Sequence, residues 1–202
     1  MCAVFSISLC KFIDGRGTLL DPPSRGSRMK NQLFVEDMKG DCGGFYDLWM
    51  VHDGECGVCG DAYGDAKPRK HESGGTFGRG RIVKTYNSES MINITVKITK
   101  NQLGTFTFGI CSLDLDHLED DECFKKHPIY PASLRHYQLN PSTLAGKINI
   151  TIQLPKFFKC VRCVLRWTYY TADKLGICMD DTKQIGCGQQ DQFRSCSDIS
   201  LI

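Results

Sequence analysis

The chain has no hydrophobic run close to the roughly 20 apolar residues that a membrane-spanning helix needs. It also has no excess of charge of one sign, because 25 basic residues nearly balance 23 acidic ones and leave a net charge of +2. A nucleic-acid-binding protein is expected to carry a basic stripe, so this balance argues against one and favours a neutral partner. No internal repeat and no linker-like stretch divides the 202 residues, so the length fits one domain with a sizeable core.

Cysteine, in contrast, is abundant. Two of the 12 cysteines, Cys2 and Cys10, lie in a leader-like segment. The other ten could form five disulfides and are Cys42, Cys56, Cys59, Cys111, Cys123, Cys160, Cys163, Cys178, Cys187 and Cys196. Disulfides persist in oxidising compartments, so we predict a secreted, extracellular protein stapled by disulfides whose connectivity the sequence leaves open.

Zinc is the competing interpretation of these cysteines. Cys56 and Cys59 form one CxxC pair and Cys160 and Cys163 form another, and two such pairs can build a tetrahedral thiolate site. Their separation far exceeds the spacing of a zinc ribbon, and six cysteines would remain unexplained. We therefore favour disulfides and keep a zinc-stabilised intracellular domain as an alternative.

Two segments, residues 92–99 and 148–154, alternate isoleucine or valine with polar residues. A period of two is typical of a half-buried β-strand, with the isoleucines facing a core and the polar residues facing solvent. Asn93 and Asn149 lie on the polar faces, and each begins an Asn-Ile-Thr sequon. We therefore predict that both asparagines are N-glycosylated.

Further strand patterns occur at residues 81–86, 105–110 and 164–171, and an acidic segment ending in lysines could hold a short helix within residues 114–126. Residues 14–80 are predicted to be loops with one short helix, and the tail, residues 172–202, to be turn-rich. Short strands with long connections favour an antiparallel β-sandwich. We expect Trp49, Trp167, Tyr169 and Tyr170 in its core and His52, His117, His127 and His136 at its surface.

Residues 1–13 resemble a poor signal peptide. They have no basic start, their apolar run is short, and Lys11 interrupts it. We therefore treat them as a leader or a misassigned N-terminus, and residues 14–202 as the single domain.

Seven stretches, in order along the chain, resemble one known family. They are residues 15–25 (GRGTLLDPPSR), 42–45 (CGGF), 56–63 (CGVCGDAY), 68–75 (PRKHESGG), 160–171 (CVRCVLRWTYYT), 186–188 (GCG) and 193–199 (FRSCSDI). Together they resemble the chitin-binding type-4 group of lytic polysaccharide monooxygenases, specifically its animal branch. The resemblance runs from Gly15 to the C-terminus.

The resemblance implies an all-β fold: a fibronectin III- or immunoglobulin-like antiparallel β-sandwich with long disulfide-stapled loops and one or two short helices. It also implies one copper ion in a histidine brace, formed by the imidazole and terminal amine of an N-terminal histidine together with a second histidine. His71 matches the second histidine, and Phe193 matches the aromatic residue beside the axial position. Nitrogen ligands with an open tetragonal position suit copper.

One residue departs from the family pattern. Asp14 precedes Gly15 where the family has its first histidine, and a carboxylate is a hard ligand that is not expected to replace it. Either the true mature N-terminus is a histidine that this sequence misrepresents, which we favour, or catalysis has been lost. The segment between Arg28 and Asp41 is also shorter than expected and lacks the tryptophan-containing stretch of relatives.

The leading hypothesis is therefore a copper oxidoreductase that cleaves chitin or a related β-linked polysaccharide, using an external electron donor and oxygen or peroxide. The alternative is a non-catalytic extracellular module that binds chitin or holds copper, in which Asp14 is genuine. Nothing in the sequence indicates an oligomer, so a monomer is expected.

Overall fold

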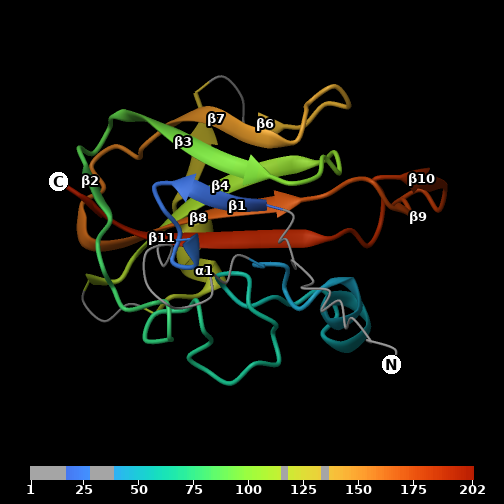
Figure 1. The fold of residues 1–202 in the computed structure, drawn as a ribbon, viewed down its shortest axis with the longest axis horizontal. Coiled ribbons are helices and arrows are strands. Elements are labelled where there is room, and N and C mark those ends of the chain that lie inside the picture. Colours follow the sequence, from blue (N-terminus) through green and yellow to red (C-terminus); the bar gives the residue numbers. More distant parts are fainter. Residues whose placement is uncertain (1–16, 28–38, 115–117, 133–136) are drawn as a thin grey trace, which may run out of the picture.

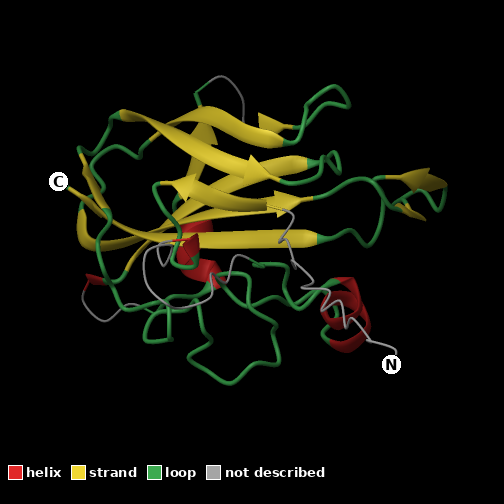
Figure 2. Ribbon diagram, viewed as in Figure 1, coloured by secondary structure: helices red, strands yellow, loops and turns green. Residues whose placement is uncertain are grey.

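The computed structural model describes residues 17–27, 39–114, 118–132 and 137–202, which form a curled β-sandwich covered on one side by long loops (Figures 1 and 2). This is the fold class that the sequence predicts. None of the helices in the described residues is long and apolar enough to span a membrane.

The strands follow the alternating segments of the sequence. They are β1 (Gly17–Asp21), β2 (Lys84–Tyr86), β3 (Met91–Ile98), β4 (Thr105–Ser112), β5 (Pro128–Pro131), β6 (Tyr137–Gln138), β7 (Gly146–Gln153), β8 (Cys160–Tyr170), β9 (Leu175–Ile177), β10 (Lys183–Ile185) and β11 (Gln192–Leu201). Two short helical segments accompany them, the π-helical η2 (Asp47–Val51) and α1 (Asp121–Lys126). Asp120 caps α1, because its side chain accepts a hydrogen bond from the backbone N–H of Cys123.

The two layers of the sandwich belong to one continuous sheet in the order β1-β3-β7-β5-β4-β8-β11-β2, with β6 beside β4. The fold between the layers occurs at β5, where Pro128 and Ile129 pair with β4 while Tyr130 and Pro131 pair with β7. Pairing is antiparallel except between β2 and β11, which are parallel. β9 and β10 form a separate two-stranded hairpin that extends beyond the end of the sandwich (Figure 1).

The core lies between the two layers and is filled by every second residue of the long strands. Its members include Ile92, Ile94, Val96 and Ile98 of β3, Ile148, Ile150 and Ile152 of β7, Phe106 and Ile110 of β4, and Leu165, Trp167 and Tyr169 of β8. Period-two patterning therefore determines which face of each strand is buried. Burial of these side chains is the main favourable contribution to folding, at about 25 cal/mol per Å² of apolar surface.

Several sequence-based expectations need correction, among them that of Trp49, which is half-buried and packs outside the main core. The tail is not mainly turns, because β11 is a ten-residue strand in which every residue is buried. Its pattern QFRSCSDISL hides the strand, since loops cover its outer face and both faces are therefore buried. β1 likewise forms within a segment predicted to be loops. Tyr170 is 44% exposed, unlike Trp167 and Tyr169, which are fully buried as expected.

The ten cysteines form five disulfides: Cys42–Cys56, Cys59–Cys196, Cys111–Cys123, Cys160–Cys163 and Cys178–Cys187. The zinc alternative is therefore wrong, because no thiolate of either CxxC pair remains for a metal. Cys160–Cys163 closes one CxxC pair on itself, whereas Cys56 and Cys59 each bond to a distant partner.

The loops of residues 39–80 lie against the outer face of β8 and β11, on the opposite side of the molecule from β3 and β7 (Figure 1). Cys59 is bonded to Cys196 of β11, and the backbone N–H of Arg194 donates to the carbonyl of Gly40 at 2.8 Å. Arg194 and Arg166 also bind Asp121 of α1 from β11 and β8. These contacts attach the loops and α1 to the sheet and fix the region that contains His71.

Candidate metal centre

His71 lies in a tight loop that its neighbours in sequence stabilise. The guanidinium of Arg69 binds the Glu72 carboxylate at 2.6 Å and also donates to the carbonyls of Ala62 and Tyr63. Glu72 accepts hydrogen bonds from the backbone N–H groups of Arg69 and Val58. Arg69 and Glu72 therefore stabilise the loop that carries His71. Their contacts are structural and assign them no catalytic role.

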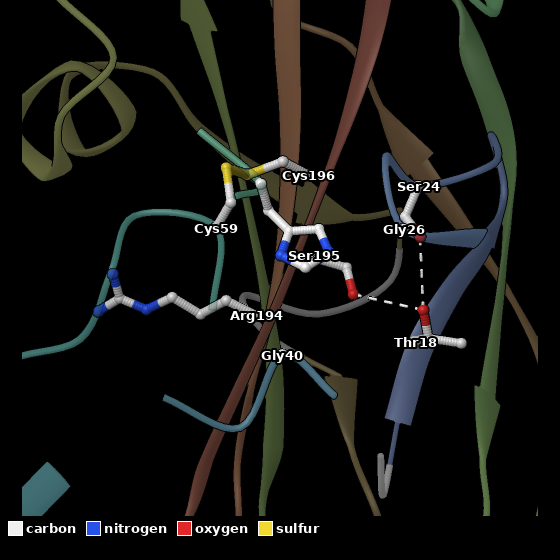
Figure 3. Close-up of a pocket in the computed structure, with 9 residues that line it drawn as sticks. Thr18, Ser24, Gly26, Gly40, Cys59, Arg194, Ser195 and Cys196 are labelled. Carbon is white, nitrogen blue, oxygen red and sulfur yellow. Dashed lines mark hydrogen bonds between the residues drawn. A yellow bond between two sulfur atoms is a disulfide. The ribbon is translucent and has the colours of Figure 1, made fainter. Parts of the chain in front are cut away.

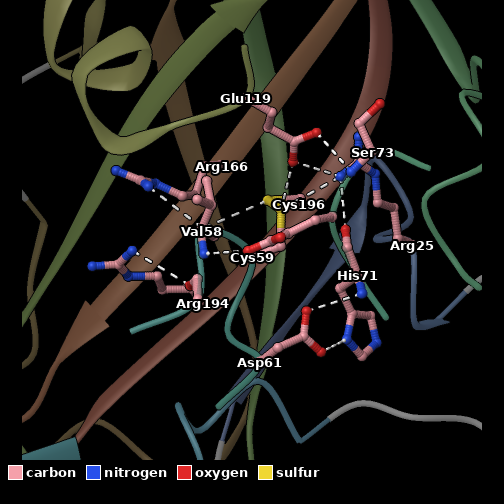
Figure 4. Close-up of a disulfide and its surroundings, with 12 residues drawn as sticks. Arg25, Val58, Cys59, Asp61, His71, Ser73, Glu119, Arg166, Arg194 and Cys196 are labelled. Carbon is pink, nitrogen blue, oxygen red and sulfur yellow. Dashed lines mark hydrogen bonds and ion pairs between the residues drawn. A yellow bond between two sulfur atoms is a disulfide. The ribbon is translucent and has the colours of Figure 1, made fainter. Parts of the chain in front are cut away.

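The imidazole of His71 is clamped by a carboxylate (Figure 4). Its Nδ1 lies 2.7 Å from Oδ1 of Asp61, and its backbone N–H donates to Oδ2 of the same side chain at 2.9 Å. His71 and Asp61 are both only 7% exposed. One carboxylate thus holds His71 at two points, through the backbone N–H and through Nδ1 of the ring.

The other contacts of His71 fix it further. Its carbonyl oxygen accepts a hydrogen bond from Nη1 of Arg25 at 2.7 Å. The ring of Phe77 stacks on the imidazole, with centroids 4.8 Å apart and planes inclined by 20°. The backbone and the ring plane of His71 are therefore set by residues from three separate parts of the loops.

Arg25 is the centre of a buried ion cluster behind His71. It binds Asp198 of β11 and Glu119 at 2.6 Å each and is 1% exposed. Burial alone would lower the pKa of Arg25, but the two carboxylates outweigh it and raise the pKa, so Arg25 stays charged. Burial raises the pKa of Glu119, although Arg25 opposes the shift. Glu119 in turn accepts the backbone N–H of Ser73, two residues after His71, at 3.0 Å.

A small cavity opens beside His71 (Figure 3). Its walls are Thr18, Ser24, Gly26, Gly40, Cys59, His71, Arg194, Ser195 and Cys196. Thr18 of β1 lies across from Ser195 of β11, with their hydroxyl oxygens 3.5 Å apart. The cavity volume is about 10 Å³, room for about one water molecule, so a sugar ring cannot enter it. Any polysaccharide substrate would have to lie on the outer surface.

Phe193 lies near the start of β11, directly before Arg194 and Ser195 of the cavity wall. Its side chain is 4% exposed and packs against Tyr169 across β8, with ring centroids 5.9 Å apart. Phe193 is not itself a wall residue of the cavity. It is a core residue next to the cavity, which is compatible with the axial role that the family resemblance implies.

The structure brings two of the residues predicted for the site close to each other, at the cavity. His71 lies in the cavity wall and Phe193 adjoins it, whereas Asp14 lies outside the described residues. His52 and His127 are half-buried and occupy other regions, with His52 3.7 Å from Asp47 and His127 packed against Phe158. His117 and His136 also lie outside the described residues.

Among the described residues, one other group could by proximity bind a metal: Cys59, Glu119 and Cys196. Its two sulfurs are bonded to each other, so neither can act as a thiolate ligand. His71 offers a better donor. An imidazole with its Nδ1 held by a carboxylate is the usual arrangement of a histidine ligand that binds a metal through Nε2, and imidazole suits copper.

Sequence reasoning missed the two residues that hold His71. Asp61 and Arg25 each stand within a stretch that carries the family resemblance, but no local pattern distinguishes them from other charged loop residues. Asp61 is ten positions from His71 and Arg25 is 46 positions away. Only the folded loops bring the three together.

Comparisons with known proteins agree with this fold. A family model described as "Lytic polysaccharide mono-oxygenase, cellulose-degrading" matches residues 17–199. The chain superposes on lytic polysaccharide monooxygenase AA15 from Thermobia domestica, solved in the Cu(I) state, with a TM-score of 0.86 and 34% identity, covering 92% of this chain and 98% of that one. A search of curated proteins found no match.

A more distant structure shares the fold. The AA10 lytic polysaccharide monooxygenase from Streptomyces lividans superposes with a TM-score of 0.60 and 11% identity over 91% of this chain and 99% of that one. The β-sandwich is thus the fold of lytic polysaccharide monooxygenases. The chain belongs to the lytic polysaccharide monooxygenase family, and its 34% identical relative is of the AA15 type.

Proposed function

We propose that the protein is a secreted, copper-dependent monooxygenase that cleaves chitin or a related β-linked polysaccharide when its mature N-terminus is a histidine. His71 would hold one copper ion through Nε2, and the N-terminal histidine would supply the remaining nitrogens. When bound, copper would supply one-electron redox chemistry with an external donor and would activate oxygen or peroxide toward a glycosidic C–H bond. Phe193 would lie near the metal without binding it, because a benzene ring supplies no strong donor.

The observation that carries this proposal is the clamped orientation of His71 beside the start of β1. Thr18 and His71 line the same cavity, and position 14 is four residues before Thr18. Four residues can span at most about 14 Å, so a residue at that position is within reach of the cavity. A histidine there could therefore share a metal with His71, whereas a carboxylate would favour harder cations.

The substrate would bind on the surface around the cavity rather than inside it. The protein's contribution to the reaction is then to present the His71 side of the cavity to one chain of an extended polysaccharide. The buried ion cluster of Arg25, Glu119 and Asp198 behind His71 would keep the histidine in place during this contact. The family name gives cellulose as a substrate of relatives, and both cellulose and chitin are β-linked.

The same proposal includes secretion of the protein and its N-glycosylation at Asn93 and Asn149. Five disulfides suit an oxidising compartment. Asn93 and Asn149 are exposed on adjacent strands, with Asn93 opposite Thr151 and Asn149 opposite Thr95. The hydroxyl of Thr151 donates to Oδ1 of Asn93 at 2.8 Å, and that of Thr95 to Oδ1 of Asn149 at 2.9 Å. The two sequons are therefore cross-strand neighbours, and both asparagines are exposed on β3 and β7, the strands on the far side of the molecule from the His71 loops (Figure 1).

The alternative is a non-catalytic module that binds the polysaccharide. Asp14 in the printed sequence favours it, because one imidazole and a carboxylate would hold copper weakly. The same surface would then dock on the polysaccharide without oxidising it.

The N-terminus of the protein purified from its source, read by mass spectrometry, separates the two. A chain that starts with histidine directly before Gly15 should bind one Cu(II) tightly and release oxidised oligosaccharides from chitin when a reductant is added. A chain that retains Asp14 should bind Cu(II) weakly and leave chitin intact. A histidine-initiated chain whose Cu(II) affinity is unchanged by His71→Ala would contradict the proposed site.

A further inference from the structure

We propose that Asp61 is the positioning residue of the metal centre: it holds His71 in the Nδ1–H tautomer and turns Nε2 toward the metal. This inference rests on the proposed function for its metal, but the clamp itself is a property of the protein alone. Neither the sequence patterns nor the family resemblance assigns a role to Asp61.

The clamp is a two-point contact. Oδ1 of Asp61 meets the ring nitrogen Nδ1 of His71, and Oδ2 accepts the backbone N–H of the same residue. The backbone contact fixes the carboxylate relative to the His71 main chain, and the ring contact then fixes the rotation of the imidazole. The backbone contact alone would leave that rotation free, because the terminal torsion of histidine is broad.

The chemistry of the pair sets the tautomer. An ionised carboxylate has only acceptor oxygens, so the ring nitrogen that faces it must carry the proton. In a neutral imidazole with a proton on Nδ1, the lone pair lies on Nε2. Binding of the other ring nitrogen to a carboxylate also makes a histidine ligand more basic toward a metal. Asp61 thus determines which atom of His71 can bind copper.

The fold holds Asp61 itself firmly. Its carbonyl accepts the backbone N–H of Gly57 at 3.0 Å and closes a tight turn. A Cβ at Gly57 would lie 2.7 Å from that carbonyl oxygen, so this turn requires glycine. Disulfides anchor the turn through Cys56 to Cys42 and through Cys59 to β11. The two disulfides therefore support the clamp.

Arg25 completes the support of His71 from the opposite side. With the backbone N–H and Nδ1 bound by Asp61 and the carbonyl bound by Arg25, three polar groups of His71 are committed to the protein. Buried backbone groups have hydrogen-bond partners in almost any fold, but here a single carboxylate binds both the backbone N–H and the ring nitrogen of His71. This degree of constraint is what a metal ligand with a fixed direction requires.

The tautomer is tested by long-range ¹H–¹⁵N NMR of the full chain labelled with ¹⁵N-histidine. In the wild-type protein without added metal, we expect His71 as the Nδ1–H tautomer. Asp61→Ala should convert it to a mixture or to the Nε2–H form, whereas Asp61→Asn, which keeps an acceptor oxygen at the same place, should retain much of the wild-type signal. Asp65→Ala removes an exposed carboxylate from the same loop and should change nothing.

A wild-type His71 in the Nε2–H form, or His71 shifts that are unchanged in Asp61→Ala, would overturn the proposal. If Asp61→Ala does not fold, the Cu(II) titration of the Asp61→Asn variant, described next, tests the proposal instead.

The second measurement titrates Cu(II) into the secreted mature protein and records its electron paramagnetic resonance spectrum. Loss of a carboxylate partner of a histidine ligand usually weakens metal binding about 10–100-fold, so Asp61→Ala should raise the Cu(II) dissociation constant by that factor. Asp61→Asn should fall between Asp61→Ala and wild type, and Asp65→Ala should match wild type. A folded Asp61→Ala or Asp61→Asn variant with wild-type affinity and spectrum would refute the positioning role.

Failure of the proposed function would look different. In that case His71→Ala and wild type would bind Cu(II) equally weakly, while the NMR experiment would still report whether Asp61 sets the tautomer of His71. The two hypotheses can therefore fail separately.

Discussion

The disulfide between Cys59 and Cys196 joins the loop that carries Asp61 to strand β11, which carries Phe193, across 137 positions of sequence. The bond lies in the wall of the cavity that also contains His71. It therefore connects the two halves of the candidate site, which are far apart along the chain.

Removing this disulfide should weaken both the fold and the site. We expect Cys59→Ala with Cys196→Ala to lower the free energy of unfolding by about 2–5 kcal/mol, because the bond closes a long loop in the unfolded chain. Chemical denaturation measures this change. The matched control is Cys178→Ala with Cys187→Ala, which opens a loop of separation 9 in the protruding hairpin and should cost less. An equal loss of unfolding free energy for the two disulfide variants would contradict the greater structural importance that we assign to Cys59–Cys196.

Asp121 should make stability depend on acid pH. Burial alone would raise the pKa of its carboxyl, but Arg194 and Arg166 outweigh burial and hold the pKa below its usual range. A carboxyl with a lowered pKa in the folded state stabilises the protein above its unfolded-state pKa of 3.8, and this contribution is lost as the pH falls through the folded-state value.

The corresponding variant is Asp121→Asn, measured by denaturation at several pH values. At pH 7 it should be less stable than wild type by about 1–3 kcal/mol, since the buried Arg194 and the half-buried Arg166 lose a charged partner. The difference should shrink as the pH falls below about 4. Glu122→Gln, which removes an exposed neighbour paired with Lys125, should show little change at any pH. A stability difference between wild type and Asp121→Asn that grows as the pH falls would contradict a lowered pKa of Asp121.

The sequons predict a defined pattern of glycan masses. Protein secreted from an insect or other eukaryotic cell should lose two glycans on treatment with an N-glycosidase, and Asn93→Gln or Asn149→Gln should each remove one. Thr95→Ser keeps the first sequon and should keep both glycans, whereas Thr95→Ala should lose one. A secreted wild-type protein whose mass does not change on treatment would refute the prediction.

Phe193 should matter to stability and to the copper spectrum in separable ways. Phe193→Ala removes a buried ring and should cost about 3–5 kcal/mol, whereas Tyr170→Ala on the neighbouring strand, whose side chain is 44% exposed, should cost clearly less. Phe193→Tyr adds an oxygen donor and should alter the electron paramagnetic resonance spectrum of the Cu(II) protein. An unchanged spectrum in a folded, copper-loaded Phe193→Tyr protein would argue against the axial position.

Much of the fold could be read from local patterns. The isoleucines of β3 and β7 alternate with polar residues, and the period of two alone predicts both strands and their buried faces. The sequence did not predict β5, β6, β9 and β10, which have only two to four residues each, nor β1 and β11. β1 is short, and β11 is covered on both faces, so its serines, aspartate and arginine are buried against other polar groups and show no alternation.

The amino-acid sequence by itself determined a disulfide-stapled β protein, because cysteine number and strand periodicity are local features, and its seven motifs carried the family resemblance. It left open how the cysteines pair and what holds His71. The tertiary structure decided both, since Asp61, Arg25 and the Cys59–Cys196 bond act across the fold. Their effect depends on the distances between groups remote in sequence, and those distances exist only once β11 and the loops have packed together.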